Sequence, residues 1–157
     1  MKKTLLSLVA TFSLATPAFA ADTHVAWQGF FTVTGTTAAC AGLGGTSVGD
    51  TNVSIYRPGF STTDHSSMNI IFTRAAMNVW NADETVNPQM RGSGNATVNA
   101  MNSKAKLFKY STTYSNIVTT PSTIFNGTTY LAITGTLNNM WNVSGCNVTF
   151  KASYSKE

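Results

Sequence analysis

The sequence predicts an all-β fold, an antiparallel sandwich or small barrel of about eight or nine strands with one disulfide. The clearest sign is the segment from Gly145 to Tyr154, where apolar and polar residues alternate with a period of two. Similar short apolar runs recur along the chain between turns rich in Gly, Asn and Pro, and none has a strong amphipathic helical pattern. In addition, the only two cysteines, Cys40 and Cys146, lie near opposite ends of the expected domain.

The first 20 residues have the three parts of a secretory signal peptide. A basic start, Met1-Lys2-Lys3, is followed by a short apolar segment and by the small-x-small ending Ala18-Phe19-Ala20. Cleavage after Ala20 would leave residues 21–157 as a single all-β domain, located in the periplasm or secreted. The apolar segment is shorter than the roughly 20 residues of a membrane span, and no later stretch approaches that length. We therefore expect no membrane span after signal removal.

The charge pattern gives no indication of a nucleic-acid partner. Loss of Lys2 and Lys3 with the signal peptide lowers the net charge to about +2. The remaining basic residues are scattered, whereas a polyanion-binding surface needs them clustered. The exception is the trio Lys104, Lys106 and Lys109, which we interpret as a solvated strand edge.

Two cysteines in an exported chain are expected to pair. A bond between Cys40 and Cys146 would tie the last strand to the loop after the first strand, and it would stabilise the fold by about 4.7 kcal/mol on the chain-entropy model. A free reactive pair or a metal-binding pair is the alternative. It is disfavoured because neither cysteine has a neighbouring His, Lys or second Cys that would favour the thiolate.

Nine segments have the composition and periodicity of strands, although a helix over residues 73–80 is an alternative for one of them. Their ranges are 25–34, 51–57, 68–74, 76–81, 96–101, 104–112, 115–125, 128–137 and 145–154. A long Gly- and Thr-rich loop, residues 35–50, carries Cys40 and is expected to be pinned by the disulfide. The best hairpin signal is Asn126-Gly127, because both positions of such a turn need a positive φ.

Catalytic chemistry is not indicated. An enzyme needs titratable groups that converge on one site. The run Asp64-His65-Ser66-Ser67 has the residue types of a catalytic triad, but sequence neighbours do not present its geometry, so a serine-rich turn is the better interpretation. The pair Asp83-Glu84 reads as a solvated loop end. We expect no enzyme and no cofactor, with a hydrolase as the remaining alternative.

Methionine is a possible copper ligand when several side chains cluster. In this chain the methionines are spread at strand spacing, which predicts core packing and no metal site. After signal removal they are Met68, Met77, Met90, Met101 and Met140.

Aromatic residues are the best candidates for a ligand site. Their flat rings suit a sugar or an apolar ligand. The candidates are Trp27, Trp80, Trp141 and Tyr130. Core packing is the competing interpretation for the tryptophans, and the sequence does not show which of these residues converge.

Short motifs are similar to those of small exported β proteins of Gram-negative bacteria. They are Cys40 in its Gly/Ala/Thr loop, Tyr56-Arg57-Pro58 after it, and the run from Gly145 to Phe150. The resemblance implies export, one disulfide and β structure, and it brings no function. Chaperone-assembled fimbrial subunits are similar in size and composition, but a disulfide spanning nearly the whole domain argues against such a polymer. Outer-membrane barrels are similar in length, but no continuous lipid-facing apolar band is present here.

These observations predict a non-catalytic exported surface, structural or interaction protein of the bacterial envelope, with an envelope protein or a glycan as partner. The alternative is a small binding protein that holds a sugar or an apolar ligand on an aromatic-lined face or barrel mouth. Converging Trp and Tyr side chains would favour binding, and an exposed unpaired strand edge would favour assembly.

Overall fold

The computed structural model describes residues 26–58, 66–73, 75–81, 92–102, 107–122, 124 and 127–156. For residues 80–81, 92–102 and 107–112 it describes the backbone alone. The predicted signal peptide, residues 1–20, lies outside the described residues, as do Asp64-His65 and Asp83-Glu84.

The described part of the chain contains eight strands and two short 3-10 helices. The strands are β1 (Trp27–Thr36), β2 (Thr51–Arg57), β3 (Ser67–Phe72), β4 (Ala75–Asn81), β5 (Gly92–Asn102), β6 (Leu107–Thr120), β7 (Tyr130–Asn138) and β8 (Val148–Ser155), and the 3-10 helices are η1 (Ala38–Cys40) and η2 (Met140–Asn142). The all-β prediction is confirmed. The alternative of a helix over residues 73–80 is wrong, because β4 occupies most of that range and pairs with both β3 and β5.

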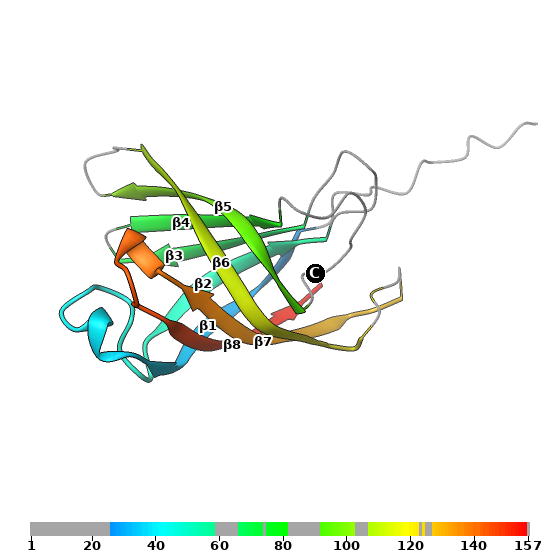
Figure 1. Cartoon of the computed structure of the whole chain (residues 1–157). Helices are drawn as coiled ribbons and strands as arrows, with labels where there is room; N and C mark the ends of the chain where they lie inside the picture. Colours follow the sequence, from blue (N-terminus) through cyan, green and yellow to red (C-terminus); the bar gives the residue numbers. More distant parts are fainter. Residues whose placement is uncertain are drawn as a thin grey trace, which may run out of the picture.

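The eight strands follow one another around a closed antiparallel barrel (Figure 1). Each strand pairs with the next, and β8 also pairs with β1, from Gln28 opposite Ser155 to Thr36 opposite Val148. A register shift between Val33 and Gly35 marks a bulge in β1. Because each of these eight strands has a neighbour on both sides, the barrel presents no open sheet edge.

The inward positions of the strands fill the barrel with side chains. In β8 these are the buried residues Val148, Phe150, Ala152 and Tyr154, as the alternation predicts, while Cys146 lies in the loop before the strand. The ring of Phe150 stacks on that of Phe31 with centroids 4.8 Å apart. Such packing is usual for eight-stranded barrels, whose interior is just wide enough for side chains to fill.

The outer face of β1 carries an exposed aromatic residue. Phe30 lies on the face opposite to the buried Trp27, Phe31 and Val33. In the structure its side chain is 59% exposed. The apolar side of β1 is therefore the inner one alone.

Strand β6 replaces two predicted strands. Residues 104–112 and 115–125 were expected to form separate strands, but β6 runs continuously from Leu107 to Thr120. Asn116 has a φ of 56° and the register with β7 shifts at this point, so the strand contains a bulge. The bulge lets Tyr114 and Ile117, three residues apart, both face the core.

The connection from β6 to β7 is longer than the sequence predicts. β6 ends at Thr120, before Pro121, and β7 begins at Tyr130. A two-residue hairpin turn at Asn126-Gly127 would need strands that continue to both sides of that pair, and they do not. Asn126 itself lies outside the described residues.

Inside the core, hydrogen bonds of one serine connect β2 to β3 and to β8. The Ser54 hydroxyl donates to the backbone carbonyl of Asn69 at 2.8 Å, and it lies 2.9 Å from the Tyr154 hydroxyl. Because the only hydroxyl proton of Ser54 is directed at Asn69, Tyr154 donates to Ser54. Burial raises the pKa of Tyr154 well above that of a free tyrosine.

The raised pKa of Tyr154 predicts a loss of stability in alkali. Its contribution is fully present below about pH 10, where a tyrosine of the unfolded chain ionises, and is lost as the pH rises towards the higher folded-state pKa. Above about pH 10, the free energy of unfolding of the parent should therefore fall as the pH rises. We expect Tyr154→Phe to make this slope shallower by up to about 1.4 kcal/mol per pH unit. Urea denaturation at a series of pH values measures this slope. The exposed Tyr130 supplies the control Tyr130→Phe, which should keep the parent slope; an unchanged slope in Tyr154→Phe would contradict the prediction.

Candidate functional site

Two loops close one end of the barrel. Residues 37–50 connect β1 to β2 and residues 139–147 connect β7 to β8, and both lie at the end opposite the C-terminus (Figure 1). We call these two loops the cap. The predicted disulfide between Cys40 and Cys146 is confirmed and joins them, with an S–S distance of 2.07 Å. Thr37 adds a second connection, because its hydroxyl donates to the Gly145 carbonyl at 2.6 Å and accepts from the Asn147 N–H at 3.0 Å.

Polar side chains give the first loop of the cap a defined shape. Thr46 is buried, and its hydroxyl lies 2.8 Å from the carbonyl oxygen of Leu43 and 3.1 Å from that of Cys40. At the end of the loop, the Asp50 carboxylate accepts the backbone N–H of Ser47 at 2.9 Å. Loops rich in Gly and Thr need such side-chain partners because most of their backbone groups have none in a sheet.

The second loop of the cap holds Trp141 in an unusual conformation. Its φ of 56° and ψ of 23° lie in the left-handed region, as do the φ values of Asn139 and Asn142. Asparagine tolerates this region, but a bulky residue there is an outlier that costs on the order of 1–3 kcal/mol. Such residues persist where the surroundings fix them, and they cluster at binding sites.

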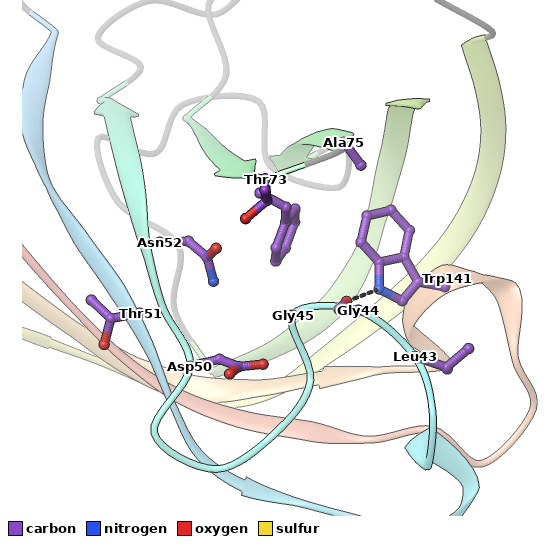
Figure 2. A pocket seen from close by; sticks show the side chains of 10 residues that line it. Leu43, Gly44, Gly45, Asp50, Thr51, Asn52, Thr73, Ala75 and Trp141 are labelled. Atoms are coloured by element: carbon purple, nitrogen blue, oxygen red, sulfur yellow. Dashed lines mark hydrogen bonds between the residues drawn. The ribbon is translucent and has the colours of Figure 1, made fainter. Parts of the chain in front are cut away.

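Two contacts fix the Trp141 ring. Its indole N–H donates to the backbone carbonyl of Gly44 at 3.0 Å, which links the two loops of the cap (Figure 2). Its ring also packs against Phe72, at the end of β3, with centroids 5.1 Å apart and planes tilted by 59°. The two rings therefore form a corner, and the half-buried Trp141 is the more exposed of the pair.

A cavity of about 550 Å³ lies between the cap and the neighbouring ends of β2, β3 and β4. This volume is within the range of small-molecule sites. We call it the cap pocket and define it by Leu43, Asp50, Asn52, Phe72, Ala75 and Trp141. Four of these residues supply apolar surface, and Asp50 and Asn52 supply the polar groups.

Packing does not explain why Asn52 lies in the cap pocket. It faces inward from β2, on the same side of the strand as Ser54 and Tyr56. Its side-chain Nδ2 is buried and makes no hydrogen bond with any residue that the structure describes. An unpartnered buried donor costs about 1–3 kcal/mol, so native proteins rarely keep one without a reason.

Figure 2 shows how the polar groups are arranged. The side chains of Asp50 and Asn52 extend from the same stretch of chain towards the interior of the pocket, whereas Thr51 between them points away. This follows from the two-residue period of a strand. Trp141 stands on the opposite side, so a bound molecule would lie between the aromatic ring and the two polar groups.

The polar chemistry of the cap pocket comes from a few groups. Of the described side chains that line it, only Asp50 carries a formal charge. Within the described ranges, no three His, Cys, Asp or Glu side chains gather to hold a metal ion.

The structure does not bring the four aromatic candidates together. Trp141 lines the cap pocket, but Trp27 is buried in the core at the far end of β1, opposite Tyr56. Tyr130, also at that far end, is 51% exposed on the outer face of β7. Trp80 lies on β4 with its backbone opposite Ser67. Its side chain does not belong to the described part of the structure.

The polar residues of the pocket were missed from the sequence, although one signal was present. In the predicted strand 51–57, the period-two pattern puts Asn52 on the same face as Tyr56. An asparagine at an inward strand position needs a hydrogen-bond partner, and that requirement marks it as a candidate. Phe72 gave no comparable signal, because a buried phenylalanine is ordinary in a core.

No protein-family model, curated protein or solved structure matches this chain. Among the residues that the structure covers, no helix has the length and apolar character needed to cross a membrane. A fold by itself does not imply a function. The chemistry of the cap pocket is therefore the basis on which a function can be assigned.

Proposed function

We propose that this protein is a non-catalytic, exported binding protein that holds a small molecule in the cap pocket. The observation that carries the proposal is the position of Trp141, kept in a costly left-handed conformation at the wall of a pocket, opposite an unpartnered buried amide. Both features reduce the stability of the free protein. Functional sites are where proteins retain such costs.

The closed barrel favours binding over assembly by strand addition. A polymer of the fimbrial type, or any partner that adds a strand, needs an unpaired sheet edge. Each of the eight described strands is paired on both sides. The disulfide fits an oxidising compartment, the periplasm or the medium, where the partner molecules would be envelope glycans or other small solutes.

We expect a screen of small probes to locate the site. Suitable probes are neutral methyl pyranosides, methylammonium, a short fatty acid, inorganic phosphate and benzyl alcohol, each titrated into the labelled protein and followed by amide chemical shifts. At least one probe should perturb residues 43–52 and 72–75, and it should be recovered chemically unchanged.

Two neighbouring alanines provide matched variants for this screen. Ala75→Phe enlarges a side chain that lines the cap pocket and should abolish the shifts, whereas Ala76, the next residue, is exposed on the outer face, so Ala76→Phe should preserve them. If no probe perturbs the cap pocket, or if Ala75→Phe binds like the parent, the proposed binding function is rejected. The structural or interaction role would then be the one to pursue.

A further inference from the structure

We infer that the ligand of the cap pocket is a neutral sugar, bound as a pyranose ring with its hydroxyls on Asn52 and Asp50 and its C–H face on Trp141. This inference rests on the proposed function, since it names the chemical class of the molecule that the pocket holds. It follows from three properties of the pocket: its hydrogen-bonding groups, its charge and its aromatic surface.

The hydrogen-bonding groups require a ligand that both accepts and donates. The Asn52 Nδ2 is a donor without a partner, so the ligand must supply an acceptor. Asp50 is acceptor-only when ionised, and after receiving the N–H of Ser47 it has lone pairs left for a ligand donor. A hydroxyl group can do both, and adjacent hydroxyls on one ring can reach two side chains that extend from the same side of the chain (Figure 2).

The charge of the described lining residues disfavours the main competitors. Among these residues Asp50 is the only charged side chain, so a phosphate or carboxylate ligand would meet a like charge and no compensating cation from them. An ammonium ion would pair with Asp50 and could lie over the Trp141 ring. It has no lone pair, however, and would leave the Asn52 donor buried and unpartnered.

The aromatic surface separates a sugar from a wholly apolar ligand. Trp141 and Phe72 form a corner of flat apolar surface. The C–H face of a pyranose can pack against such a surface while its hydroxyls point to polar groups. A hydrocarbon would fill the same corner but bury Asp50 and Asn52 without partners. The combination of one ring surface with one donor and one acceptor therefore favours a polyhydroxylated ring.

The sharpest test is Asn52→Leu, a change of similar size that removes the amide. Because Nδ2 has no partner among the described residues, the variant should be more stable than the parent, with a melting temperature higher by roughly 2–8 °C. Its affinity for the pyranoside that binds the parent best should nevertheless fall by about tenfold or more. A residue with a merely structural role would not combine a gain in stability with a loss of binding. Thr32→Leu, on the outer face of neighbouring β1, is the control and should leave the affinity unchanged.

The titrations are run with the methyl pyranosides of glucose, galactose, mannose and N-acetylglucosamine, with methylammonium and benzyl alcohol in parallel. Binding of a pyranoside that Asn52→Leu weakens supports the inference. Binding of methylammonium or benzyl alcohol alone, or equal pyranoside affinity in Asn52→Leu and the parent, overturns the sugar assignment and leaves the binding function standing. Failure of every probe rejects both.

Discussion

Replacing Cys40 and Cys146 together with alanine is expected to lower the free energy of unfolding by about 4.7 kcal/mol. The two residues are 106 apart in sequence, so their bond closes a loop that contains most of the barrel. Without the bond the unfolded chain gains the conformational freedom of that loop, while most native contacts remain. Urea denaturation under oxidising conditions measures the loss as a lower midpoint and a changed slope.

A matched variant separates the disulfide from the rest of the cap. Thr37→Val removes the side-chain hydrogen bonds that join the same two loops and leaves the disulfide intact. Its cost should be smaller, about 0.5–1.5 kcal/mol, because water can replace the hydrogen bonds of this exposed hydroxyl and the unfolded chain gains no freedom. Unfolding curves of the double cysteine variant that coincide with those of the parent would contradict the prediction. A loss no larger than that of Thr37→Val would assign the effect to the cap alone.

Local patterns account for the parts of the fold that the sequence predicts well. The alternation in β8 identifies its inward residues, from Val148 to Tyr154, because one face of a barrel strand meets the core and the other meets solvent. The range of β2 was predicted without error, since Pro58 follows it directly. The disulfide was predicted by the small number of cysteines and by the export signal.

The errors arise where long-range packing overrides a local pattern. The sequence predicted a break at residues 113–114, between strands over 104–112 and 115–125, yet pairing with β5 and β7 carries β6 through this region with a bulge at Asn116. Turn residues alone do not end a strand that has partners on both sides. The error at the next connection is of the opposite kind, because the strands expected to flank Asn126-Gly127 end earlier and begin later than predicted, at Thr120 and Tyr130.

The candidate site was predicted only in part, because its residues come from distant segments. Trp141 was one of four aromatic candidates, and nothing in its sequence neighbourhood indicates a left-handed backbone. Asn52, Phe72 and Trp141 meet only when the barrel closes and the cap folds over its end. A one-dimensional pattern records which face of a strand each residue takes, and it does not record which strand ends become neighbours.

The second large effect concerns the closure of the barrel. Gly29→Ala is expected to lower the free energy of unfolding by about 3 kcal/mol or more. Gly29 lies on β1 opposite Tyr154 of β8, at the seam where the first and last strands meet. A Cβ at this position would lie 1.8 Å from the backbone oxygen of Ser153 and 2.8 Å from the Cα of Tyr154. Both are backbone atoms, so rotation of a side chain cannot relieve the contact and the two strands must move apart.

Gly44→Ala is the control for this prediction, because no atom lies within 4 Å of the Cβ it would add and its φ is not in the left-handed region. Its free energy of unfolding should stay within about 0.5 kcal/mol of the parent value, as for other unconstrained surface sites. Amide hydrogen exchange locates the damage in Gly29→Ala: protection should fall first along β1 and β8, whose hydrogen bonds close the barrel. Equal stability of Gly29→Ala and Gly44→Ala would mean that the two strands meet less closely at this point. A uniform loss of protection over all strands would mean that the seam has no stability of its own and that the barrel opens as one unit.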